Sequence, residues 1–100
     1  MNNLKVTTGN PQSLKDDIND KIINNVIRTW EIDNTGNYLS HKGDQYRNHF
    51  YFKYKINNTK GILEFVFYSS GTSDFADSRA FQLLERMLES HFGNRIQIIK

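Results

Sequence analysis

The sequence predicts an α+β fold, a two-layer sandwich in which two helices cover one face of an antiparallel sheet of about four strands. Two observations predict this fold. Apolar residues recur every three or four positions in one segment near each end of the chain, which indicates two amphipathic helices. Between these segments, alternating aromatic residues indicate a strand hairpin. The expected order is an optional strand, a helix, a strand, a second optional strand, two strands, a helix and a final strand.

Length and composition exclude several classes of protein. At 100 residues the chain is expected to form a single domain over 1–100, with 1–12 as an N-terminal arm or edge strand. The sequence has no Cys, which excludes a disulfide scaffold, a thiolate nucleophile and zinc sites that need Cys. No apolar run approaches the roughly 20 residues that span a bilayer. We therefore expect a cytoplasmic protein that uses no cofactor, no metal and no membrane.

The first helix is expected from about Leu14 to Trp30. Its apolar stripe consists of Leu14, Ile18, Ile22, Val26 and Trp30, widened by Ile23 and Ile27. Pro11 precedes the helix, and Ser13 is the expected N-cap. Three acidic residues, Asp16, Asp17 and Asp20, are expected near the positive end of the helix dipole and are explained structurally.

A short hairpin or one bent strand is expected next, with Trp30–Asp33 and Tyr38–His41 on either side of a turn-forming Asn-Thr-Gly segment. The strongest strand signal follows, in Phe50–Ile56, which we expect to form a hairpin with Ile62–Tyr68.

A loop centred on Asn58-Thr59 sets the register of this second hairpin. On the core face, Tyr54 is then opposite Leu63, Phe52 opposite Phe65 and Phe50 opposite Phe67. On the other face, Lys53 is opposite Glu64, Tyr51 opposite Val66 and His49 opposite Tyr68.

The second helix is expected to begin with Ser73 or Asp74 as its cap and to end at Gly93 in the left-handed conformation. Its apolar stripe consists of Phe81, Leu84, Met87, Leu88 and Phe92. Arg95–Ile99 is expected as the final strand, and Leu4–Thr7 as an additional edge strand at the start.

The order helix, three strands, helix over roughly residues 13–92 is similar in topology to the double-stranded-RNA-binding domain, although no sequence motif carries the likeness. That family has a Lys-rich start to its second helix, which binds phosphates. Here the corresponding segment, Asp74–Arg79, contains two Asp residues and a single Arg. The resemblance therefore implies a topology and no membership of the family.

Positive charge is concentrated in residues 41–61, although the formal net charge of the chain is only +2. The same segment is rich in aromatic residues. Basic side chains meet phosphates while aromatic rings stack on bases, so this combination is typical of a single-stranded nucleic-acid site. The residues expected to act in such a nucleic-acid-binding module are Lys42, Arg47, Lys53, Lys55, Lys60 and Tyr51. The aromatic residues are equally what the core of a soluble hairpin needs.

The 41–49 segment also contains two His, an Asp, a Tyr and two cations. A metal-independent ribonuclease uses a His or Tyr for proton transfer and a cation for the developing charge. A small ribonuclease that depends on His41 and His49 is therefore a further alternative. The spacing of His41, Asp44 and His49 matches no tight metal-binding motif, so no metal site is expected.

The sheet face that the helices leave open is expected to mix aromatic, aliphatic and charged side chains. Such surfaces suit protein interfaces, although one face of an antiparallel sheet often simply meets water. No catalytic motif occurs in the chain. The main hypothesis is a small non-enzymatic interaction protein, such as an immunity or inhibitor protein, that binds a protein partner or a second copy of itself through this face and the 41–49 loop. The expected partner-binding residues are His49, Tyr51, Lys53, Lys55, Val66 and Tyr68.

Overall fold

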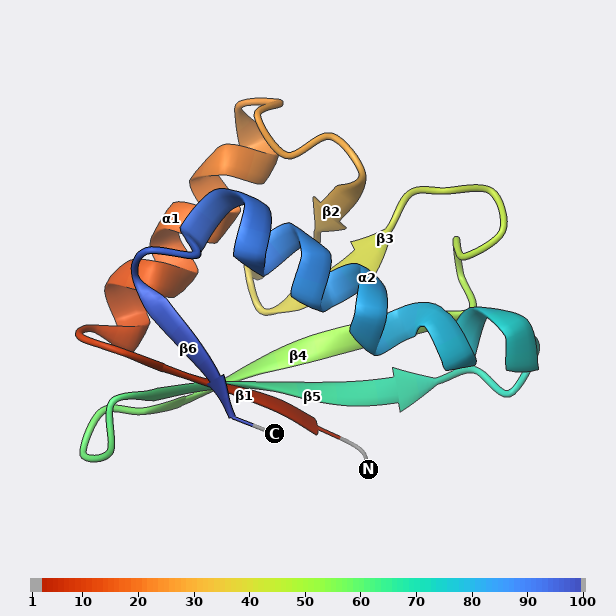
Figure 1. The fold of residues 1–100 in the computed structure, drawn as a ribbon. Coiled ribbons are helices and arrows are strands. Elements are labelled where there is room, and N and C mark those ends of the chain that lie inside the picture. Colours follow the sequence, from red (N-terminus) through yellow and green to blue (C-terminus); the bar gives the residue numbers. More distant parts are fainter. Residues whose placement is uncertain (1–2, 100) are drawn as a thin grey trace.

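The computed structural model describes residues 3–99 and confirms an α+β fold with one antiparallel sheet and two helices. Both helices lie on the same face of the sheet (Figure 1). The elements are β1 (Asn3–Thr8), α1 (Pro11–Ile23), β2 (Trp30–Ile32), β3 (Tyr38–His41), β4 (Phe50–Asn57), β5 (Ile62–Ser69), α2 (Asp74–Phe92) and β6 (Ile96–Ile99). The strands lie in the order β2-β3-β4-β5-β1-β6. The prediction of about four strands was wrong, because both optional strands form and the sheet has six.

The N-terminal strand β1 lies inside the sheet, so its prediction as an arm or edge strand was wrong for the part of 1–12 that the structure describes. Val6 is paired with Leu63 of β5 on one side and with Ile98 of β6 on the other. The local pattern of β1 does not reveal this position, because it depends on where α2 returns the chain to the sheet. The strand β6 then covers the second edge of β1.

Helix α1 ends at Ile23, so the prediction that it continues to Trp30 was wrong. Asn25 adopts the left-handed conformation, with φ of 61°. The Val26 amide donates to the Lys21 carbonyl at 2.8 Å, and the Asn25 amide donates to the Ile22 carbonyl at 3.2 Å. These two bonds form a Schellman motif, which satisfies carbonyls at the helix end and turns the chain away.

The early helix end redistributes the predicted apolar stripe. Ile23 and Val26 are 67% and 54% exposed. Trp30 instead begins β2 and is fully buried, and Ile27 is also buried in the core.

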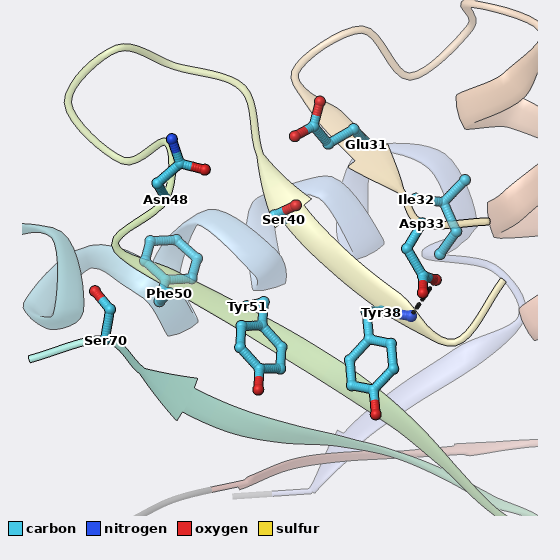
Figure 2. Close-up of a pocket in the computed structure, with 9 residues that line it drawn as sticks. All are labelled: Glu31, Ile32, Asp33, Tyr38, Ser40, Asn48, Phe50, Tyr51 and Ser70. Atoms are coloured by element: carbon cyan, nitrogen blue, oxygen red, sulfur yellow. Dashed lines mark hydrogen bonds between the residues drawn. The ribbon is translucent and has the colours of Figure 1, made fainter. Parts of the chain in front are cut away.

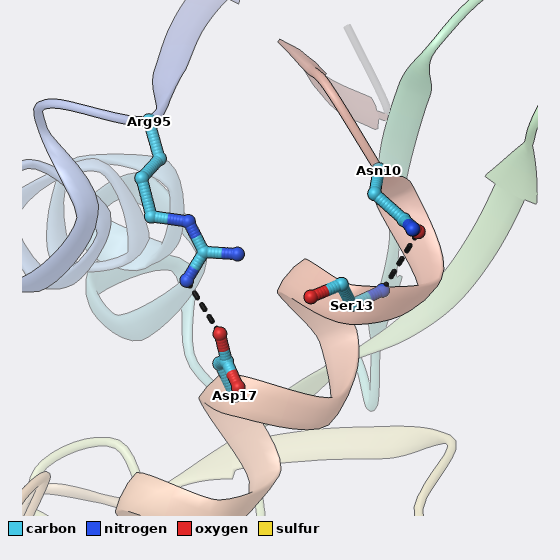
Figure 3. A network of polar contacts seen from close by, with 4 residues as sticks. All are labelled: Asn10, Ser13, Asp17 and Arg95. Carbon is cyan, nitrogen blue, oxygen red and sulfur yellow. Dashed lines mark hydrogen bonds and ion pairs between the residues drawn. The ribbon is translucent and has the colours of Figure 1, made fainter.

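The start of α1 also differs from the prediction, because the N-cap is Asn10 and not Ser13. The Asn10 side chain accepts a hydrogen bond from the Ser13 amide at 3.0 Å, and Pro11 occupies the first helical position, where its missing N–H costs nothing. The acidic residues of α1 consequently lie beyond its first turn. One of them, Asp17, forms an ion pair with Arg95 just before β6 (Figure 3).

The β4–β5 hairpin forms with a register different from the predicted one. Phe52 pairs with Phe67, two positions beyond the predicted Phe65, and Tyr54 pairs with Phe65. The cause is Gly61, whose φ of +65° belongs in a turn, so that the loop spans 58–61. A shift of two positions keeps each strand side chain on its predicted face of the sheet.

Helix α2 begins as predicted, because the Ser73 side chain accepts a hydrogen bond from the Ala76 amide at 3.0 Å. Its end differs, since Gly93 is right-handed, with φ of −53°. Glycine is required there for a different reason, because an added Cβ would lie 2.7 Å from the Glu89 carbonyl oxygen. The strand β6 forms as predicted, with Ile96 and Ile98 half-buried and Ile99 exposed on the other side.

The core lies between the sheet and the two helices and is dominated by aromatic rings. Phe52, which is fully buried, lies at its centre. Its ring centroid is 6.2 Å from that of Trp30, 5.6 Å from that of Phe67 and 5.5 Å from that of Phe81 on α2. Rings from β2, β4, β5 and α2 thus hold the two layers together.

Comparing two glycine substitutions tests the role of Gly61. Both Gly61 and Gly71 have a positive φ, so Ala at either position should cost about 1 kcal/mol of backbone strain. A Cβ at Gly61 would also lie 3.0 Å from the Thr8 carbonyl oxygen, whereas nothing lies within 4 Å of one at Gly71. We therefore expect Gly61→Ala to lower the free energy of unfolding more than Gly71→Ala, as measured by urea denaturation. Equal losses would contradict the close approach of β1 to this loop.

Candidate functional site

Three tyrosine rings form a row across the open face of the sheet. The centroid of Tyr51 on β4 lies 5.4 Å from that of Tyr38 on β3, edge to face, and 5.0 Å from that of Tyr68 on β5, stacked at 14°. Tyr51 and Tyr68 are each 40% exposed. Within residues 3–99, none of the three hydroxyls forms a hydrogen bond. We call Tyr38, Tyr51 and Tyr68 the tyrosine row.

A groove adjoins this row where β3 and β4 diverge (Figure 2). Pairing between β3 and β4 stops at Leu39 and Phe52. Pairing of β3 with β2 continues to His41, and pairing of β4 with β5 continues back to Phe50. The resulting splayed groove has a volume of about 550 Å³. It is lined by Glu31, Ile32, Asp33, Tyr38, Ser40, Asn48, Phe50, Tyr51 and Ser70.

The side chain of Tyr46 packs where the two strands separate. If the register of β3 and β4 continued, His41 would lie opposite Phe50. The Tyr46 ring instead packs against both, with its centroid 5.0 Å from that of His41 and 6.4 Å from that of Phe50. It also stacks on Phe75 of α2 at 6.1 Å. The Tyr46 ring therefore packs against both strands at the point where their pairing stops.

The splayed groove contains two carboxylates with different roles. Asp33 is committed to the β2–β3 turn, where it accepts hydrogen bonds from the Asn37 amide at 3.1 Å, the Tyr38 amide at 3.0 Å and the Thr35 hydroxyl at 2.7 Å. Desolvation acts to raise the pKa of Asp33, but these hydrogen bonds outweigh it and lower the pKa below its ordinary value. Glu31 is half-buried, and its carboxylate forms no hydrogen bond or ion pair with any residue of 3–99.

The five basic residues predicted to bind nucleic acid do not form one cluster. Lys53 and Lys55 extend from the open face of β4, and the Lys53 Nζ lies 5.7 Å from the Tyr38 ring centroid. Lys60 lies in the β4–β5 loop. Lys42 and Arg47 lie in the loop before β4, where the Arg47 Nε donates to the Lys42 carbonyl at 3.3 Å. The eight residues of β4 separate the two loops by about 26 Å at about 3.3 Å per residue.

Five of the six predicted partner-binding residues share the open face, namely Tyr51, Lys53 and Lys55 on β4 and Val66 and Tyr68 on β5. Their pairing differs from the predicted one. Tyr51 pairs with Tyr68, Lys53 with Val66, and Lys55 with Glu64.

The sixth residue, His49, precedes β4, and its Nδ1 lies 2.6 Å from the Thr72 hydroxyl.

The sequence reasoning missed Tyr38 and Glu31 at this site. The strict alternation around Leu39 was the available signal for Tyr38, because Leu39 is buried and its neighbour faces the other way.

Of the two histidines in the predicted 41–49 segment, His41 lies in the core. His41 is buried, and its Nδ1 accepts a hydrogen bond from the Gly43 amide at 2.9 Å. Its ring packs edge-on against Trp30, with a centroid distance of 5.1 Å. Burial lowers the pKa of His41 below its ordinary value of 6.5, which favours the neutral form that this hydrogen bond requires. Its observed contacts are thus those of a core residue.

Because the folded state lowers the pKa of His41, the unfolded chain binds more protons at mildly acidic pH. The free energy of unfolding should therefore be insensitive to His41 above about pH 6.5 and should fall as the pH drops below it. Urea denaturation between about pH 7.5 and about pH 5 measures this slope. We expect His41→Gln to flatten the slope. A wild-type slope in His41→Gln would contradict this role.

Over residues 3–99, no helix has the length and apolar character to cross a membrane, and no three His, Asp or Glu side chains are grouped so as to hold a metal ion. No protein-family model, curated protein or solved structure matches the chain.

Proposed function

We propose that this chain is a small non-enzymatic protein-binding module whose partner docks on the open face of the sheet, over the tyrosine row and the splayed groove. The observation that carries the proposal is the tyrosine row itself. Three rings, whose hydroxyls form no hydrogen bond with any residue of 3–99, lie side by side on an open face, next to a groove of about 550 Å³. A cytoplasmic immunity or inhibitor protein is the type of accessory protein that fits this size and surface.

Tyrosine suits this role because a rigid ring supplies contact area at a small cost in side-chain entropy, while its hydroxyl supplies a hydrogen bond. Tyr is among the residues most enriched at the energetic centre of interfaces. Contacts within the row hold Tyr51 between its two neighbours before any partner arrives. Such preorganisation reduces the entropy lost on binding.

Single-stranded nucleic acid is the alternative ligand for the same face. The observation that favours it is the position of Lys53 beside Tyr38, because a cation next to a stacking ring matches a phosphate next to a base. The remaining predicted cations are dispersed along β4 and its two flanking loops. The splayed groove also carries Glu31 and Asp33, which repel phosphates. The charge distribution therefore favours a protein partner.

A double substitution on the tyrosine row tests the proposal. The double variant Tyr51→Ser and Tyr68→Ser should retain the fold, because both side chains are exposed. Wild-type protein immobilised on a support should capture a protein from nuclease-treated lysate of its source cells. With that partner purified, the double variant should bind at least about 30-fold more weakly, as expected for hot-spot residues. The control is Ile23→Ser, which removes an exposed apolar side chain at the end of α1.

Equal affinity of the double variant and the wild type would overturn the proposal. Light scattering on the purified protein identifies a second copy of the chain as the partner. Fluorescence anisotropy with labelled single-stranded RNA, double-stranded RNA and duplex DNA at two salt concentrations tests the alternative. Binding that weakens steeply with salt and requires Tyr51 would favour nucleic acid, because phosphate contacts release counterions.

A further inference from the structure

We propose that the splayed groove receives an arginine side chain of the partner, with the Glu31 carboxylate as its counter-ion and the Tyr38 and Tyr51 rings as its walls. This inference rests on the proposed function, since it specifies what a protein partner would insert beside the tyrosine row. It adds Glu31, which lies outside that row, as the residue that determines specificity.

The first support is the unpaired charge of Glu31. Trp30 is buried beneath the sheet, so the alternation of β2 directs its neighbour Glu31 to the open face. Glu31 lies opposite Ser40 on β3, and no described residue neutralises it. A half-buried carboxylate without a partner is stabilised by an incoming cation, and a charge-assisted hydrogen bond is stronger than a neutral one.

The second support is the arrangement of rings. Tyr38 and Tyr51 meet edge to face, at 71°, along one side of the groove. A guanidinium is planar, weakly hydrated and stacks on aromatic faces, which an ammonium does less well. The Lys53 Nζ already lies 5.7 Å from the Tyr38 centroid, which shows that a cation is accommodated at this ring.

The third support is the polar lining of the groove. A guanidinium carries five N–H donors and no acceptor, so it needs several oxygen atoms around it. Ser40, Asn48 and Ser70 line the groove together with Glu31. Asn48 adopts the left-handed conformation, with φ of 67°, and Figure 2 shows its side chain among the other lining residues. The volume of about 550 Å³ also leaves room for residues on either side of the arginine.

The charges of Glu31 and Lys53 should have opposite effects on the affinity of the groove for an arginine side chain. The Lys53 Nζ lies 5.7 Å from the centroid of Tyr38, a ring of the groove, so Lys53 opposes the entry of a second positive charge while Glu31 attracts it. Removing the charge of Glu31 should therefore weaken binding, and removing the charge of Lys53 should strengthen it. A phosphate-bearing ligand would show the two effects with opposite signs.

The test uses a blocked Ala-Ala-Arg-Ala-Ala peptide and a matched peptide with citrulline, which is neutral and nearly isosteric with arginine. Two-dimensional NMR titration should show amide shifts around Glu31, Ser40 and Tyr51 with the arginine peptide. We expect Glu31→Gln to weaken binding by at least about fivefold and Lys53→Gln to strengthen it by about twofold. Glu89→Gln, an exposed charge on α2, is the control and should change nothing.

Equal binding of the two peptides, or no groove shifts at millimolar arginine peptide, would overturn the inference. The proposed function has a separate outcome. If the tyrosine double variant loses the captured partner while Glu31→Gln retains full affinity, the face binds protein but not through an arginine. Loss of partner affinity in both variants, with preference for the arginine peptide, supports both proposals.

Discussion

The candidate site depends on one feature of the packing, the contact of the Tyr46 ring with His41 of β3 and Phe50 of β4 where the pairing of these strands stops. Antiparallel strands tend to pair along their whole length, because each unpaired backbone group loses a hydrogen bond. Here the Tyr46 ring, from the loop between β3 and β4, packs against both strand ends, and Phe75 of α2 stacks on it. The pairing of β3 and β4 stops at this point, and the groove on the open side lies where the two strands are unpaired.

The alternation of β4 divides its residues between two functions. Phe50, Phe52 and Tyr54 point inward and form the aromatic core, whereas Tyr51 and Lys53 point to the open face. A strand with this pattern is held firmly by its inner face, so its outer side chains are presented on a rigid support. The same division in β2 buries Trp30 and presents Glu31. The elements that stabilise the fold therefore also position the residues of the proposed site.

The sequence was sufficient for the parts of the fold that local patterns determine. The alternation in β4 and the apolar stripe of α2 predicted those elements and their inward faces correctly. It was insufficient at the end of α1 and for the number of strands, because an apolar repeat does not show where the backbone leaves the helix. The apolar repeat continued through Val26, but the left-handed Asn25 ended α1 before it. The helix, three strands, helix order of the double-stranded-RNA-binding domain also fails, because residues 13–92 contain four strands between the helices.

The candidate site was predicted in part, for similar reasons. Tyr51 and Tyr68 were placed on the open face, but their direct pairing depends on the loop conformation at Gly61. The splayed groove was not predicted, because it depends on where the pairing of β3 and β4 stops, and no local pattern marks that point. Contacts across the sheet therefore carry the information that the local sequence pattern lacks.

Hydroxyl-radical footprinting of the protein inside its source cells, compared with the purified protein, tests most directly whether the open face is a binding surface. Tyr51 and Tyr68 are 40% exposed, and Phe75 on the helical side is 49% exposed, so all three react in the purified protein. We predict that the two tyrosines become protected in cells while Phe75 remains reactive. Unchanged reactivity of the tyrosines, or protection of Phe75 alone, would contradict a partner on this face.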